Sequence, residues 1–168
     1  MTQLFAQPYD ITAYGFYFET AEEYQEKASK LRNSSDWPVE EFEIQFIDGE
    51  MIDAKLFRAL DVSQCNFEVF LEAVENWDYQ DKVKVIIAVG EAGYSFDFRN
   101  SIPEDFDIDL YQMDSLRELA EQFVEEGLFG EIPDNIRHYL DYDAIARDLG
   151  MDYSITRIDG TNYVYRCG

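Results

Sequence analysis

The sequence predicts an α+β protein made of short strands and small helices. Hydrophobic residues make up 46% of the 168 residues and aromatic residues 16%, too much for a disordered acidic tail. Stretches with a period of two residues lie between stretches with a period of 3.6, without the strand–helix–strand rhythm of a parallel sheet. Connections near residues 62 and 102 divide the chain into an α+β lobe (1–62), a mostly helical lobe (63–102) and an acidic α+β lobe (103–168).

The first lobe begins with a segment typical of a strand. Ile11–Phe18 is β-branched and aromatic, so we expect it to be extended. Thr20 and Glu23 have the spacing of a capping box and predict a helix that ends near residues 33–35. The alternation in Phe42–Ile47 predicts a second strand, and a turn follows it.

The central lobe is predicted to be mostly helical. Apolar residues recur with a helical period over residues 67–77. The apolar run Val83–Val89 fits either a buried strand or a short core helix, and the pattern does not decide between them. Gly90 and Gly93 predict a turn after it.

The third lobe has the clearest pattern. Residues 105–110 alternate strictly, so a strand would place three carboxylates on one face, about 6.6–6.8 Å apart. Ser115 and Glu118 form a second capping box, and Gly127 ends the helix that it opens. We expect a short helix from Pro133 onward, with inward-facing apolar side chains. These are Ile136, Tyr139 and Leu140.

The chain is predicted to close with a helix and a hairpin. Asp141–Leu149 has the helical pattern, and Gly150 follows it. Tyr153–Ile158 and Tyr163–Arg166 flank an Asp-Gly pair, which is typical of a two-residue hairpin turn.

The net charge of −23 is the most unusual property of the sequence, and it is unevenly distributed. Residues 36–53 hold seven acidic residues and no basic one. Residues 104–152 hold 15 acidic and three basic residues. These two segments carry −19 of the total, whereas a salt-adapted surface would spread its carboxylates evenly. A protein this acidic is not expected to bind nucleic acid or a membrane, and a basic partner is expected instead.

No pattern in the sequence indicates catalysis, a cofactor or a metal site. His138 is the only histidine, and no nucleophile motif accompanies it. Asp105, Asp107 and Asp109 begin like a calcium-binding loop, but Leu110 and Leu116 occupy the positions of the required Gly and Glu. Weak divalent binding by clustered carboxylates stays open, as does an enzyme using a carboxylate pair.

The remaining sequence features predict a cytoplasmic protein. The two cysteines are far apart and form no metal-binding pattern, so we expect reduced thiols. The chain has no leader-like opening and no run of about 20 apolar residues.

The size of the negative charge can be compared with that of DNA. Duplex DNA presents one charge per about 1.7 Å of its axis, so 23 charges in a line would match about 39 Å of duplex.

Residues 115–149 resemble the ArdA antirestriction family. In that family an acidic helix leads through a Gly-x-hydrophobic-Gly-x-x-Pro turn into a Y-x-D-Y-x-x-x-x-R-D-L helix. The matching residues here are Gly127, Gly130, Pro133, Tyr139, Asp141, Tyr142, Arg147, Asp148 and Leu149. Weaker similarity covers residues 14–18, 40–44 and 67–77, while the opening of the chain departs from the family pattern.

The resemblance implies an elongated, three-lobed, non-catalytic protein that forms a homodimer and mimics bent DNA. It implies that the target is the DNA-binding groove of type I restriction–modification enzymes, formed by their specificity and methyltransferase subunits. Such proteins help conjugative elements to enter a restricting host. The alternative is an acidic interaction module for another basic or DNA-binding protein.

We expect 14 carboxylates to form the mimicking surface, and Arg147 and Asp148 to pair within the fold. The fourteen are Glu40, Glu41, Glu43, Asp105, Asp107, Asp109, Glu118, Glu121, Glu125, Glu126, Asp134, Asp141, Asp143 and Asp148.

Overall fold

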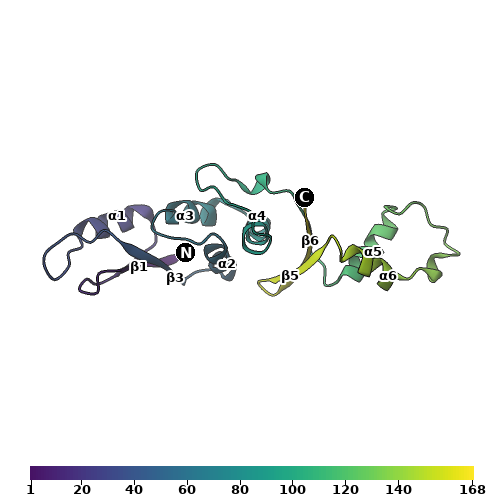
Figure 1. The fold of residues 1–168 in the computed structure, drawn as a ribbon, viewed down its shortest axis with the longest axis horizontal. Coiled ribbons are helices and arrows are strands. Elements are labelled where there is room, and N and C mark those ends of the chain that lie inside the picture. Colours follow the sequence, from purple (N-terminus) through teal and green to yellow (C-terminus); the bar gives the residue numbers. More distant parts are fainter. The chain divides into compact units, whose positions relative to one another are not determined.

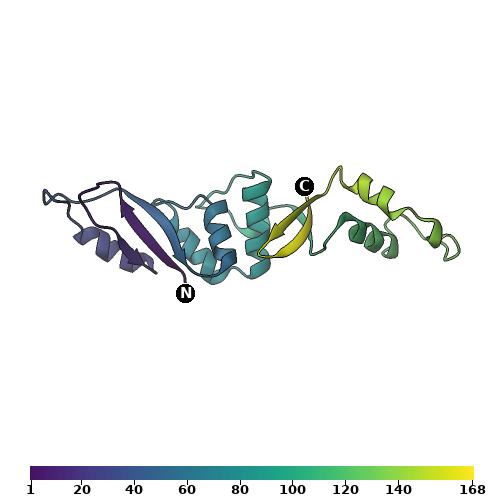
Figure 2. The same ribbon diagram turned by 90° about the horizontal axis from the view of Figure 1, so that it is seen from below.

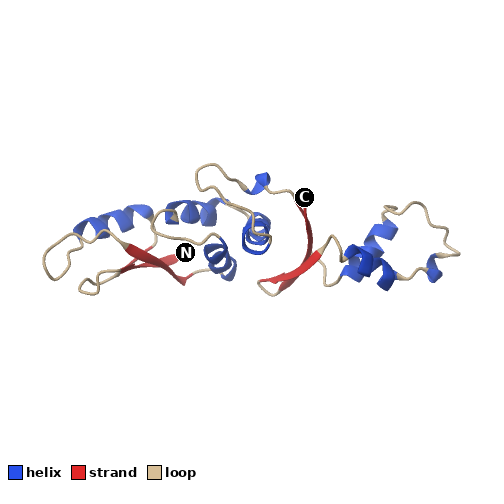
Figure 3. Cartoon of the chain, viewed as in Figure 1, coloured by secondary structure: helices blue, strands red, loops and turns tan.

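The structure, a computed structural model, describes all residues from Met1 to Gly168 and contains two compact units, residues 1–106 and 107–168. Each unit combines a three-stranded antiparallel sheet with helices (Figures 1 and 3), so the predicted α+β class is confirmed. The division of the chain into three lobes stays a prediction.

The sheet of the first unit has one buried face. Its strands β1 (Gln3–Pro8), β2 (Phe16–Phe18) and β3 (Phe42–Asp48) are ordered β2-β1-β3. The register places Leu4 beside Phe18 and Phe46. Because side chains alternate along a strand, these residues share one face of the sheet, while Phe5 and its neighbours point to the other.

Helices α1 and α3 lie along the buried face of this sheet (Figures 1 and 2). Phe18 contacts Tyr24 and Phe67, with ring centroids 5.0 and 5.3 Å apart. Such edge-on aromatic pairs add stability beyond the area that they bury. The helical segments of the unit are α1 (Ala21–Lys30), α2 (Met51–Ala59), α3 (Phe67–Asn76), α4 (Tyr79–Val85), the π-helical η1 (Ile86–Glu91) and the 3₁₀ turn η2 (Pro103–Asp105).

A buried ion pair connects three helices of the first unit. Lys82 Nζ of α4 donates to Asp53 Oδ1 of α2 at 2.7 Å and to the Val74 carbonyl of α3 at 3.1 Å. Both charged side chains are buried, with 8% and 4% of their surface exposed. The pair therefore fixes the packing of helices that otherwise contact one another through apolar side chains.

The second unit also combines a three-stranded antiparallel sheet with helices, and its core is smaller. Strands β4 (Ile108–Tyr111), β5 (Ser154–Ile158) and β6 (Thr161–Cys167) are ordered β4-β6-β5. Helices α5 (Leu116–Glu125) and α6 (Tyr142–Leu149) complete the unit, together with the short 3₁₀ turn η3 (Arg137–Tyr139). The core residues Leu119, Phe123, Tyr153 and Val164 pack together, and the half-buried Leu116 and Leu149 border them.

Two elements of the first unit differ from the sequence prediction. Of Ile11–Phe18, only Phe16–Phe18 forms a strand, and residues 11 and 12 lie in a turn. The turn is held by Asp10, whose carboxylate accepts bonds from both the amide and the hydroxyl of Thr12. Helix α1 ends at Lys30, before the expected residues 33–35.

The prediction also missed β1 and α2, and the structure resolves the open alternative for Val83–Val89 in favour of helix. Gly90 lies inside η1, whereas Gly93 adopts a positive φ of 75° at the turn. Asp105 lies in η2 rather than in a strand, because its carboxylate accepts a bond from the Ile102 amide at 2.9 Å. The expected row of three strand carboxylates is therefore wrong.

The segment from Pro133 to Leu140 was also wrongly predicted. It forms a turn and the 3₁₀ helix η3 instead of a helix with an inward apolar face. Ile136 is 46% exposed and Tyr139 is 85% exposed. Both side chains are available to solvent, although their spacing is that of a buried helix face.

The buried ion pair generates a stability prediction. Lys82→Met should lower the free energy of unfolding by about 3–5 kcal/mol, because it leaves Asp53 buried without a partner. Urea denaturation followed by circular dichroism measures the change. Lys84→Met, on the same helix and without an ion pair in the structure, is the matched control. The double variant Lys82→Met/Asp53→Leu should be more stable than Lys82→Met alone; equal losses for Lys82→Met and Lys84→Met would contradict this role.

Candidate acidic binding surface

Most of the predicted carboxylates are accessible to a partner. Twelve of the 14 residues are exposed, and the other two, Asp109 and Glu121, are half-buried. Glu40, Glu41 and Glu43 lie on and before β3 in the first unit, and Asp105 lies in η2 of the same unit. The remaining ten lie in the second unit, just before and on β4, on α5, between α5 and α6, and on α6.

Some of these carboxylates cap helices. The Ser115 hydroxyl accepts a bond from the Glu118 amide at 3.2 Å, and Glu118 Oε2 accepts from the Asp114 amide at 3.1 Å. Asp141 caps α6 by accepting from the Ala144 amide at 3.0 Å. Negative side chains at these positions also interact favourably with the positive end of the helix. Their charge therefore stabilises the fold as well as remaining exposed.

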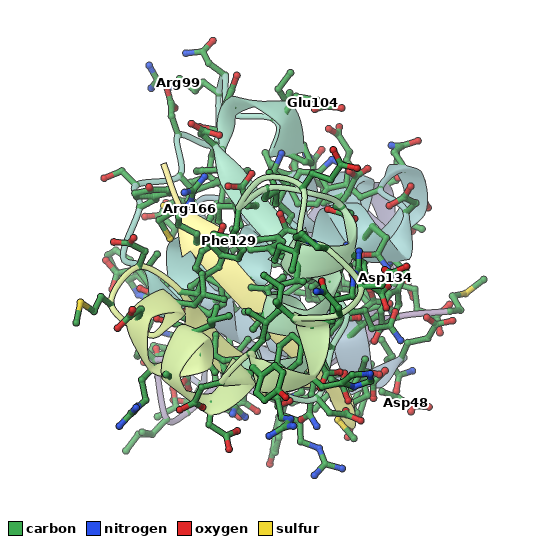
Figure 4. The ribbon with its side chains drawn as sticks, turned by 90° about the vertical axis from the view of Figure 1, so that its right-hand side faces the viewer. Asp48, Arg99, Glu104, Phe129, Asp134 and Arg166 are labelled. Carbon is green, nitrogen blue, oxygen red and sulfur yellow. The ribbon has the colours of Figure 1, made fainter.

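Others are paired with the arginines of the second unit. Arg117 of α5 donates to Asp143 of α6 at 2.7 Å, and this bond joins the two helices. Arg117 also donates to Glu121 at 3.2 Å, and both bonds raise the pKa of the guanidinium. Arg166 on β6, labelled in Figure 4, contacts Asp109 on β4 at 2.6 Å. Arg137 lies 3.4 Å from Asp134. These exposed pairs position the side chains and contribute little stability individually.

Five of the predicted carboxylates have no hydrogen-bond or ion-pair partner in the structure. They are Glu40, Glu41, Asp107, Glu125 and Asp148, and all five are exposed. The expected pairing of Arg147 and Asp148 within the fold is wrong, because neither side chain forms an ion pair. These five carboxylates are free to bind an external cation without first breaking an internal contact.

Nearly half of the basic side chains of the chain are occupied by internal ion pairs. Six of the 13 basic side chains form ion pairs with carboxylates of the same chain; they are Lys27, Lys30, Lys82, Arg117, Arg137 and Arg166. Internal hydrogen bonds also favour the ionised form of some carboxylates: Lys27 lowers the pKa of Glu23, and the Arg99 amide lowers the pKa of Asp97. The unpaired charge that the molecule offers to a partner is therefore mainly negative.

A further acidic region was missed by the sequence analysis. A hollow of about 290 Å³ in the first unit lies between α3 and the start of α1 and is lined mainly by glutamates. Glu68, Glu72 and Glu75 on α3 have the i, i+4, i+7 spacing that places side chains on one helix face. Lys82 and Lys84 dilute the net charge of this part of the sequence, so a count by segment did not reveal it.

The single histidine and the acidic side chains form no metal centre. His138 lies exposed on η3. No group of three or more histidine, cysteine or carboxylate side chains is placed to hold a metal ion. No helix combines the length and the apolar composition that a membrane crossing requires.

The fold and these exposed side chains define a small, strongly acidic α+β protein with free carboxylates on both units. A model of the family described as antirestriction protein (ArdA) matches residues 8–164, so the chain belongs to the ArdA family. A search of curated proteins finds no match. Membership of this family implies antirestriction activity against type I restriction enzymes.

The excess of like charge predicts how salt affects stability. Raising NaCl from about 0.01 M to about 0.1 M shortens the Debye length from about 30 Å to about 10 Å, and so weakens repulsion between exposed carboxylates. We expect the thermal unfolding midpoint to rise over this range, as measured by calorimetry. The few exposed ion pairs are screened too, but each contributes little. A midpoint that falls with salt would show that attraction outweighs repulsion in the folded state.

Proposed function

We propose that the protein acts as a mimic of DNA, competing for the DNA-binding groove of type I restriction–modification enzymes. The observation that carries the proposal is the set of exposed, unpartnered carboxylates on both units of a chain that belongs to an antirestriction family. A groove that binds duplex DNA displays lysine and arginine to replace counterions. Carboxylates held on folded elements offer that groove the same charge without any bases to read or cleave.

Inhibition by this route requires no chemical step from the protein. Rigid opposite charges accelerate encounter and orient the partners before contact. The groove that we propose as the target is formed by the specificity and methyltransferase subunits. Occupation of that groove in the cytoplasm would protect an incoming conjugative element for as long as the complex lasts.

We further propose that the functional form is a homodimer held by the segment between α5 and α6. Leu128 and Phe129 on this segment are 62% and 54% exposed, and Ile136 and Tyr139 are exposed as well (Figure 4 labels Phe129). These four exposed apolar side chains lie within one segment of the chain, and patches of such side chains are typical of protein–protein contacts. Two copies would double the charge available to the groove, and an apolar contact would offset their repulsion.

The first experiment is displacement of labelled DNA from a type I methyltransferase core by the purified protein. We expect stoichiometric displacement that weakens as salt increases, because the contacts are electrostatic. Fluorescence anisotropy of the DNA measures it. Absence of displacement at low salt, with the protein folded, would contradict the proposal and direct the search to other basic partners.

Matched triple variants test which carboxylates matter. Asp107→Asn/Glu125→Gln/Asp148→Asn removes three unpartnered charges of the predicted surface and should weaken displacement about tenfold, or about 1.4 kcal/mol. The control is Glu104→Gln/Glu131→Gln/Asp152→Asn, three exposed carboxylates outside the prediction. Equal losses in the two variants would mean that net charge acts at long range, without a localised mimicking surface.

The dimer is tested separately by Leu128→Asp/Phe129→Asp. Two added carboxylates in the apolar contact should convert the dimer to a monomer, because burying unpaired charge is unfavourable. Sedimentation velocity measures the mass. Met151→Asp, which changes an exposed apolar side chain outside this segment, is the control and should leave the dimer intact. A wild-type protein that sediments as a monomer at working concentration would refute the proposed dimer.

A further inference from the structure

The first unit carries a group of large exposed side chains on two loops, residues 9–15 and 31–41. Ile11 is 97% exposed, Tyr14 88%, Trp37 69% and Tyr9 66%. We name these four residues, three aromatic ones and Ile11, the aromatic tip. Both loops lie at the same end of the first unit (Figures 1 and 2). Single exposed apolar residues are ordinary, but four on two adjoining loops call for an explanation.

The loops are held together by hydrogen bonds. Asn33 Nδ2 donates to Asp10 Oδ2 at 2.8 Å, and the Ser34 amide donates to Thr12 Oγ1 at 3.3 Å. The Tyr9 amide donates to the Glu41 carbonyl at 3.1 Å. These bonds connect the first loop to both ends of the second. The bonds from Thr12 and Asn33 also lower the pKa of Asp10 because they favour its ionised form, and its carboxylate bonds to both loops.

Each loop is also fixed internally. Asn33 Oδ1 accepts bonds from the amides of Ser35 and Trp37 at 2.9 and 3.0 Å, and the Asn33 amide donates to the Trp37 carbonyl at 3.0 Å. In the first loop, a β-carbon at Gly15 would collide with the Phe5 ring and the Ala6 carbonyl, so the chain returns to β1 closely packed. The exposed side chains therefore project from a preorganised backbone, and binding would order little additional chain.

We propose that the aromatic tip binds arginine side chains on the surface of a basic protein partner. The charges around it select this occupant: Asp36, Glu40 and Glu41 are exposed, and Arg32 is the one basic residue of the two loops. Guanidinium groups stack on Tyr and Trp rings and pair with carboxylates, and they lose their hydration more easily than ammonium groups. A second copy of the tip would bring like charges together, and nucleic acid would be repelled.

This inference rests on the proposed function only for the identity of the partner. A DNA-binding groove is rich in basic residues, and we place the tip against arginines beside that groove. Carboxylates along the chain would then supply long-range attraction, and the tip would supply close contacts that salt screens less.

The tip can be tested without any restriction enzyme. Trp77→Phe leaves Trp37 as the only tryptophan and keeps an aromatic ring against Phe96, whose centroid lies 6.0 Å from that of Trp77. We expect a hexa-arginine peptide to change Trp37 fluorescence at a concentration at least fivefold lower than a hexa-lysine peptide of equal charge. Adding Ile11→Ala/Tyr14→Ala should raise the arginine midpoint at least threefold. Equal responses to the two peptides would overturn the inference.

A second experiment uses the methyltransferase core. Ile11→Ala/Tyr14→Ala/Trp37→Ala should bind the core about tenfold more weakly than the wild type, whereas Met51→Ala/Met151→Ala, an exposed apolar control, should not differ. Circular dichroism and thermal unfolding verify that both variants are folded. If the core binds the wild type and the tip variant equally, the inference is wrong and the proposed function stands. If the core does not bind the wild type, the proposed function fails and the peptide titration decides the inference.

Discussion

Repulsion among carboxylates is the constraint on which the rest of this structure depends. A net charge of −23 on 168 residues opposes every compact state of the chain, and an acidic chain with fewer apolar residues would stay unfolded. Dense aromatic packing opposes this repulsion. Phe18, Tyr24 and Phe67 contact one another in the first unit, and Phe123 and Tyr153 do so in the second. Large rings bury much apolar surface for each residue used, which leaves many positions available for charge.

The few positive charges are used where they act most strongly. Lys82 is buried against Asp53 and a backbone carbonyl, so its removal would leave a buried anion without a partner. Arg117 of α5 pairs with Asp143 of α6, which joins the two helices, and with Glu121 of its own helix. Helix caps use Glu118 and Asp141, so part of the negative charge stabilises the elements that display it.

Local signals predicted local structure well, and tertiary contacts account for the failures. The caps at Thr20 and Ser115 were predicted correctly because a hydroxyl and a nearby amide decide them. Asp105 was misassigned because its carboxylate accepts a bond from the backbone amide of Ile102. The alternation of polar and apolar residues carries no information about such a side-chain–backbone bond. The acidic hollow between α1 and α3 could not be predicted from charge density, since it depends on how two helices pack.

The exposed apolar residues complete the physical argument for a binding protein. Charge alone gives fast encounter but weak, salt-sensitive contact, because exposed pairs are screened and each is worth little. Affinity in protein interfaces is concentrated in a few buried aromatic or arginine residues surrounded by polar ones. Trp37 in the first unit and Phe129 in the second are exposed aromatic residues that a partner could bury in this way. A surface that was acidic only for solubility would have no need of them, whereas a surface selected to bind a basic partner requires both kinds of residue.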